Sequence, residues 1–211
     1  MTFSHMRRGG RRVGGWAGTA VLLLTAPPDR LAAQDSLPAG YGTLRRDDIA
    51  VRITTDQLDI QVLPLPEGII RLLAPDTYRS LNDLVRHRRA SIDSLAAQTG
   101  ASHATLVLVT FVGLVPQARF SPEDVNIASG GQLFRPLGIV AVSPGWGAYQ
   151  LAAREQATAI YLFDEGITFR EDLTVSYQTR SSNAWARAAR ILDQERARVR
   201  ARGAVGSAGP P

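Results

Sequence analysis

The sequence of 211 residues contains neither cysteine nor lysine, and arginine supplies all 24 of its positively charged side chains. The absence of cysteine excludes disulfide bonds, thiolate metal sites, a cysteine nucleophile and a lipid-modified N-terminal cysteine, while an oxidising compartment stays permissible. The absence of lysine excludes a phosphate-binding P-loop and a Schiff-base mechanism. Enzyme mechanisms that depend on a cysteine or a lysine side chain are therefore excluded for this chain.

Histidine is also scarce, since only His5, His87 and His103 occur. None of them belongs to a His-Glu-x-x-His or Gly-x-Ser-x-Gly motif, so neither a zinc protease nor a hydrolytic triad is expected. His87 lies within the basic run Arg86–Arg89. That run could bind phosphate groups of lipid or nucleic acid, but a solvated helix face is the favoured interpretation. We expect no catalytic residue.

Acidic residues occur in adjacent pairs at the edges of predicted strands: Asp47-Asp48, Glu123-Asp124, Asp164-Glu165 and Glu171-Asp172. Two pairs brought together could coordinate Ca²⁺ or supply the carboxyl groups of a hydrolase. The simpler interpretation is that acids populate turns and strand ends, where water solvates them. We accordingly predict no metal and no cofactor, and keep a carboxylate-based secreted hydrolase as the alternative function.

Residues 1–34 have the layout of a signal peptide. A basic stretch that ends at Arg12 precedes an apolar stretch, Val13–Ala26, and small residues follow up to Gln34. Cleavage after Ala33 or after Gln34 is compatible with this pattern, and an uncleaved N-terminal anchor is the alternative. We predict export to the periplasm or the extracellular space, with no transmembrane span in the mature chain.

Removal of these 34 residues takes away five arginines and one acid, which leaves the mature chain with a net charge of only +1. The net positive charge that would favour binding of nucleic acid is therefore almost absent from the mature chain. The mature chain is expected to begin with a linker, 35–46, rich in proline and glycine. A single domain, 47–180, follows, then a C-terminal helix, 181–202, and a disordered tail, 203–211.

The most uniformly apolar stretch, 104–115, predicts the central strand. Both of its alternating faces are apolar, so each face needs a covering layer. A long helix, 76–99, carries Tyr78, Leu81 and Val85 on one stripe and is expected to cover one face. A second sheet is expected on the other face.

Short strands separated by glycine and proline fill the remainder of the domain. This pattern is typical of a sandwich rather than a parallel sheet. The predicted strands are 49–53, 58–62, 124–128, 132–134, 138–142, 157–163 and 173–177. The predicted fold class is mainly β, with α+β as the alternative.

Four segments within 104–178 carry a resemblance to a known family. They are Val-Thr-Phe-Val-Gly-Leu at 109–114, Phe-Ser-Pro-Glu-Asp-Val at 120–125, Gly-Gln-Leu-Phe-Arg-Pro-Leu at 131–137 and Ala-Ile-Tyr-Leu-Phe-Asp at 159–164. Their succession resembles the immunoglobulin-like sandwich domains of uncharacterised exported bacterial proteins. The resemblance implies a β-sandwich and no enzyme activity, and the long helix before the central strand departs from the family pattern.

The loop 143–149 contains the best candidates for ligand contact, Trp146 and Tyr149. Gly145 and Gly147 free the backbone to display the indole, and amphipathic rings dominate binding hot spots. In the alternative, Trp146 folds back and plugs the end of the sandwich. We predict a non-catalytic binding or cell-envelope-associated module, whose partner is an unknown protein or envelope component and not nucleic acid.

Overall fold

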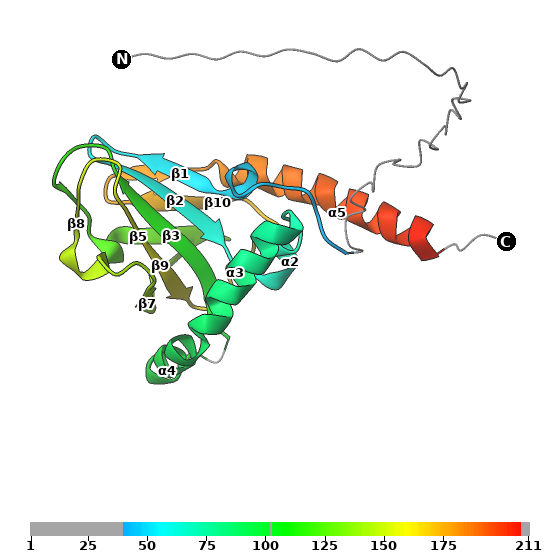
Figure 1. Cartoon of the computed structure of the whole chain (residues 1–211), viewed down its shortest axis with the longest axis horizontal. Helices are drawn as coiled ribbons and strands as arrows, with labels where there is room; N and C mark the ends of the chain where they lie inside the picture. The colour runs from blue at the N-terminus through cyan, green and yellow to red at the C-terminus, as the bar shows by residue number, and fades with distance from the viewer. Residues whose placement is uncertain (1–39, 102, 208–211) are drawn as a thin grey trace, which may run out of the picture. The chain divides into compact units, whose positions relative to one another are not determined.

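The computed structural model describes residues 40–101 and 103–207 (Figure 1). The predicted signal peptide, the first part of the predicted linker and the last four residues of the predicted tail lie outside these ranges. All described residues belong to one compact unit.

An antiparallel sheet of five strands, in the order β1-β2-β3-β9-β7, forms the centre of the fold. Its strands are β1 (Val51–Thr54), β2 (Leu58–Pro64), β3 (Thr105–Gly113), β7 (Gly138–Ala141) and β9 (Gln156–Phe163). The strand predicted at 104–115 is therefore confirmed as the central one.

The two faces of β3 are covered unequally. Val107, Val109 and Phe111 are fully buried on the inner face. On the outer face Leu108 is buried, whereas Val112 is only half-buried. The prediction that both faces are covered thus holds fully for the inner face and for only part of the outer one.

Two helices, α3 (Pro75–His87) and α4 (Arg89–Thr99), replace the single helix predicted at 76–99. The break falls at Arg88, whose backbone angles of φ −98° and ψ 3° leave the helical region. The Arg88 guanidinium donates to the carbonyl of Val142, and Leu95 of α4 packs on Gly138 of β7. The break therefore turns α4 toward the far edge of the sheet.

The stripe predicted on the first half of this helix is confirmed by burial. Leu81 is inaccessible, Tyr78 is buried, and Val85 packs against the core. Val85 and Leu106 line the same cavity, and Figure 1 shows α3 beside the start of β3. Helix α3 thus covers the apolar end of the outer face.

A second antiparallel sheet has the order β11-β10-β5-β6, and a third pairs β4 with β8. The strands are β4 (Ala118–Arg119), β5 (Val125–Ser129), β6 (Gln132–Phe134), β8 (Gln150–Leu151), β10 (Leu173–Tyr177) and β11 (Arg180–Ser182). Phe111 of the first sheet packs on Tyr177 of the second, with ring centroids 5.7 Å apart. An aromatic core thus joins the two larger sheets.

Helix and strand are present in similar amounts, 35% and 33%. The fold is therefore mixed α and β with antiparallel sheets, and the prediction of a mainly β fold is too narrow. Three further helices contribute: α1 (Arg46–Ile49), α2 (Glu67–Ile70) and α5 (Trp185–Ser207). None of the helices in the described part of the chain has both the length and the hydrophobicity that a membrane span requires.

Both ends of the described chain depart from the predicted domain boundaries. Helix α5 continues to Ser207, so the end predicted at residue 202 is too early. Order begins before residue 47, because Leu44 is buried and forms a parallel bridge with Leu73. A Cβ at residue 42 would clash with the backbone of Leu72, so only glycine permits this close approach.

Candidate functional site

Trp146 lies in the short 3₁₀ helix η2 (Trp146–Ala148) and is only 7% exposed. Its ring centroid is 5.2 Å from that of Phe120, 5.9 Å from Phe111 and 6.2 Å from Tyr161. The indole therefore plugs the core, as the alternative interpretation expected, and the hypothesis of a displayed indole is wrong.

Tyr149 has the opposite environment, because 48% of its surface is exposed. Its backbone is left-handed, with φ 50° and ψ 24°, a conformation that is uncommon for a residue with a side chain. Its carbonyl accepts a hydrogen bond from the amide of Phe120, and its ring packs edge-on against the Phe120 ring at 5.8 Å. The fold thus holds the tyrosine ring at the surface.

Trp146 and Tyr149 line the same pocket, which we call the aromatic pocket. It has a volume of about 390 Å³. Its other lining residues are Pro122, Glu123, Pro136, Leu137, Gly138 and Ile139. Glu123 is the one charged residue among them, and most of the others have apolar or aromatic side chains, although polar atoms form the larger part of the exposed lining.

The 3₁₀ helix η1 (Pro122–Asp124) contributes Pro122 and Glu123 to one wall of the pocket. The Tyr161 hydroxyl donates a buried hydrogen bond of 2.9 Å to the carbonyl of Pro122. Burial raises the pKa of Tyr161, so this hydroxyl keeps its proton at physiological pH. The hydrogen bond fixes the wall of the pocket to β9.

β7 forms one edge of the five-stranded sheet and lies against this pocket. Residues of an antiparallel strand alternate in the side to which their amide and carbonyl groups point. The Val142 amide donates to the carbonyl of Thr158 on the β9 side, and the register pairs Val140 with Ile160. Ile139 and Ala141 must then direct their peptide groups away from β9, along the free edge.

Among the described residues, no hydrogen bond uses these outward peptide groups of Ile139 and Ala141. Ala141 is exposed and Ile139 is partly exposed. The edge of β7 therefore offers unpaired donors and acceptors to an extended chain.

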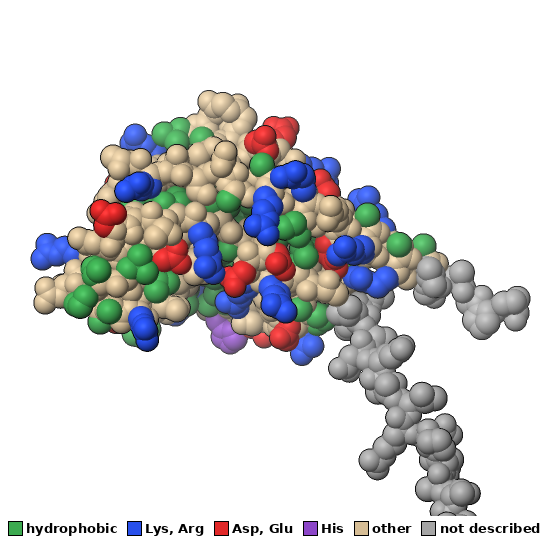
Figure 2. Space-filling model, turned by 90° about the horizontal axis from the view of Figure 1, so that it is seen from above, with side chains coloured by type: hydrophobic (Ala, Val, Ile, Leu, Met, Phe, Trp, Pro, Cys, Tyr) green, Lys and Arg blue, Asp and Glu red, His purple; other side chains and the backbone are tan. Residues whose placement is uncertain are grey.

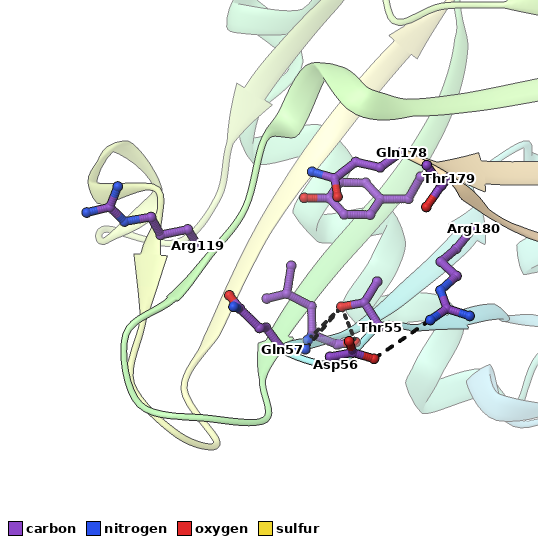
Figure 3. Close-up of a pocket in the computed structure, with 9 residues that line it drawn as sticks. Thr55, Asp56, Gln57, Arg119, Gln178, Thr179 and Arg180 are labelled. Atoms are coloured by element: carbon purple, nitrogen blue, oxygen red, sulfur yellow. Dashed lines mark hydrogen bonds and ion pairs between the residues drawn. The ribbon is translucent and has the colours of Figure 1, made fainter.

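A second pocket, which we call the hairpin pocket, lies between the turn that joins β1 to β2 and the turn that joins β10 to β11 (Figure 3). It has a volume of about 340 Å³, and its lining residues are Thr55, Asp56, Gln57, Leu58, Arg119, Tyr177, Gln178, Thr179 and Arg180. Asp56 and Arg180 form a 3.7 Å ion pair across it. Figure 3 shows the Arg119 guanidinium pointing away from this pair, so the lining is polar without a concentrated charge.

Among the described residues, neither of these two pockets brings two carboxyl groups together. The described lining residues include one carboxylate in each pocket, Glu123 or Asp56, and no histidine. Hydrolysis by paired carboxyl groups requires two such groups roughly 5 to 9.5 Å apart. In the described part of the chain, no group of three or more histidine, aspartate or glutamate side chains could hold a metal ion.

Two of the paired acids stabilise local backbone. The Asp48 carboxylate accepts a hydrogen bond of 2.7 Å from the amide of Arg45, and the Asp164 carboxylate accepts one of 2.9 Å from the amide of Glu165. Asp164 follows the end of β9, as expected if acids populate turns and strand ends, whereas Asp48 lies in the short helix α1.

The edge of β7 and the turn at Pro122 were not among the predicted contact residues. Gly138 to Val142 was predicted as a strand, but its place at the edge of the sheet depends on pairing between segments distant in the sequence. Pro122 and Pro136 are the local signal, because each proline limits strand pairing next to the pocket.

Comparison of the chain with protein-family models, with curated proteins and with solved structures gives no match.

Proposed function

We propose that the protein is an exported, non-catalytic binding module that takes an extended peptide segment along the free edge of β7. One apolar side chain of that segment enters the aromatic pocket. Strand addition of this kind derives affinity from main-chain hydrogen bonds and specificity from pockets for alternate side chains.

The observation that carries the proposal is the position of unpaired peptide groups beside a preformed pocket. Ile139 belongs to both, since its backbone lies on the free edge and it lines the aromatic pocket. The exposed ring of Tyr149 supplies a rigid apolar surface with a polar tip. Glu123 adds a negative charge at the same pocket, so the preferred segment carries an arginine or lysine next to its apolar residue.

Export is the second part of the proposal. It rests on the basic, apolar and small-residue succession of residues 1–34. We also propose that the two larger sheets form an immunoglobulin-like sandwich, supported by their antiparallel strands and by the aromatic contacts between them. A carboxylate-based hydrolase is a weaker proposal, because the aromatic pocket and the hairpin pocket each supply a single carboxylate.

Selection from a displayed library of random twelve-residue peptides tests the binding mode. We expect enriched peptides that combine an apolar residue with a basic neighbour. Ala141→Pro removes an amide that points away from β9, and it should weaken the binding of these peptides at least tenfold. Tyr149→Ala should weaken their binding by a similar factor. Ala141→Thr keeps the amide and is the matched control. Failure of any peptide to enrich, or equal affinity for the proline variant, would contradict strand addition at β7.

Expression of the complete chain in a Gram-negative host tests export. The expected product is periplasmic, and its mass corresponds to a first residue at Gln34 or Asp35. A cytoplasmic product that retains Met1 would disprove export.

A further inference from the structure

A groove formed by α2, the segment 167–170 and α5 carries arginine beside apolar side chains. We call it the arginine groove. It has a volume of about 550 Å³, and its lining residues are Pro66, Gly68, Ile69, Ile167, Thr168, Phe169, Arg170, Arg196 and Arg200. Ile69 and Ile167 are buried and Phe169 is half-buried, so they form an apolar floor. The three arginines supply the positive charge.

The charge of this groove is only partly compensated. Arg196 forms a 2.6 Å ion pair with Asp193. Arg170 and Arg200 are exposed, and within residues 40–101 and 103–207 neither has an ion-pair partner. Two guanidinium groups therefore remain available to an anion.

The other arginines near the end of α5 have a different role. Arg198 and Arg202 both contact the buried carboxylate of Glu195, at 3.3 and 3.4 Å. Figure 2 shows several basic side chains, with acidic ones among them, over the part of the surface where α5 runs. Arg170, Arg196 and Arg200, which line the groove, lie beside its apolar floor.

We infer that the arginine groove binds the phosphate headgroup of an anionic phospholipid, with the first part of an acyl chain against Phe169. Guanidinium groups bind phosphate oxygens in a bidentate manner, and basic surface clusters attract anionic lipid headgroups. Nucleic acid fits less well, because its backbone offers nothing to an apolar floor and Asp193 interrupts the basic surface. This inference is independent of the peptide site, which lies on different residues.

Co-sedimentation of the full chain with lipid vesicles tests the inference. We expect binding to vesicles of phosphatidylglycerol and phosphatidylcholine in equal parts, and at least tenfold weaker binding to phosphatidylcholine alone. The double substitution Arg170→Gln and Arg200→Gln should weaken binding to the anionic vesicles by tenfold or more. Phe169→Ala should weaken it severalfold, provided that circular dichroism shows an unchanged fold.

The matched control is the double substitution Arg187→Gln and Arg190→Gln, which removes the same charge from exposed positions of α5 outside the groove. It should change binding less than threefold. Equal loss in both double variants, or equal binding to uncharged vesicles, would overturn the inference. Binding of inorganic phosphate or of polyglutamate by a protein that does not bind anionic vesicles would overturn it as well.

Discussion

At the scale of single residues, Trp146 and Tyr149 differ in role although they lie in one short loop. Among the described residues, the indole has three aromatic neighbours and is 7% exposed, whereas the tyrosine has one aromatic neighbour, Phe120, and is 48% exposed. Burial of a large ring stabilises the fold in proportion to the apolar area removed from water. Trp146 therefore stabilises the domain, whereas Tyr149 is a surface residue available for contact.

Substitution of each ring by alanine separates these roles. Trp146→Ala should lower the free energy of unfolding by about 3 to 5 kcal/mol, because a buried aromatic ring is lost and a cavity remains. Tyr149→Ala should change it by less than about 1 kcal/mol, since surface substitutions have small effects. Urea denaturation monitored by fluorescence or circular dichroism measures both values. A loss below about 1 kcal/mol for Trp146→Ala would contradict the burial of its ring.

Glu195 is a buried acid whose partners come from both ends of the described chain. Its carboxylate accepts hydrogen bonds from the amide of Thr43 at 2.9 Å and from the Thr43 hydroxyl at 3.1 Å. Burial by itself would raise the pKa of Glu195, but the hydrogen bonds from Thr43, Arg198 and Arg202 outweigh it and hold this pKa below its ordinary value. The charged form is therefore favoured in the folded state.

A lowered pKa predicts the direction of a pH effect. Glu195 stabilises the fold at pH values above its unfolded pKa of about 4.3, and this contribution is lost as the pH falls through the lower, folded pKa. Glu195→Gln should destabilise the protein at pH 7 and should reduce the loss of stability that acid causes below about pH 4.3. Melting temperatures between pH 2.5 and pH 7 measure both effects. A variant whose profile parallels that of the wild type would contradict this role.

At the scale of elements, the register of the five-stranded sheet explains why only half of its outer face is covered. Leu108 is opposite Leu63 on β2 and Ile160 on β9, and all three are buried. Four residues along the same face, Val112 is opposite Asp59 on β2. On the outer face, apolar residues of neighbouring strands therefore lie side by side at the end covered by α3. At the end that contains Val112, polar residues lie beside it.

Lysine substitutions at these two positions test this division. Leu108→Lys should prevent folding, because an unpaired buried charge costs several kcal/mol, which is comparable to the stability of a small domain. Val112→Lys should cost less than about 1 kcal/mol, since its ammonium reaches water and lies opposite Asp59. The yield of soluble protein, and the melting temperature of each variant that is soluble, distinguish Leu108→Lys from Val112→Lys. Similar behaviour of the two variants would disprove the partial coverage.

Alternation along the sequence was sufficient to predict most strands, because burial on one or both faces leaves a pattern with a period of two. It predicted Gln132 to Phe134 and Leu173 to Tyr177 with the observed bounds. The break at Arg88 was not predicted, since the contacts that accompany it, from Arg88 to Val142 and from Leu95 to Gly138, join segments distant in the sequence. Glycine and proline suggested a linker up to residue 46, although Gly42 there is required by close packing on Leu72.

The aromatic pocket was only partly predictable for the same reason. Trp146 and Tyr149 were recognised by residue type, but a ring in a loop carries no local signal of its burial. The free edge of β7 arises from the order of strands in the sheet, and neither spacing nor composition encodes that order locally. The candidate site thus required the pairing of strands to be known.

At the scale of the whole molecule, the first described residues complete the packing around α5. The Thr43 backbone and side chain satisfy Glu195, and Arg202 donates to the carbonyl of Tyr41 at 2.9 Å. Leu44 adds a buried side chain, and its amide donates to the carbonyl of Leu72. Residues 41–44 therefore belong to the folded unit and not to a linker.

Two shortened chains test this conclusion directly. A chain that begins at residue 35 keeps all of these contacts, whereas one that begins at residue 47 leaves Glu195 buried without its Thr43 partner. Loss of the hydrogen bonds to this buried charge costs about 1.5 to 3 kcal/mol, and loss of the buried Leu44 side chain costs about 2 to 5 kcal/mol. We expect the chain that begins at residue 47 to melt at a temperature at least about 10 °C lower, or to be recovered unfolded. Equal melting temperatures would show that residues 35–46 are the linker that their composition suggests.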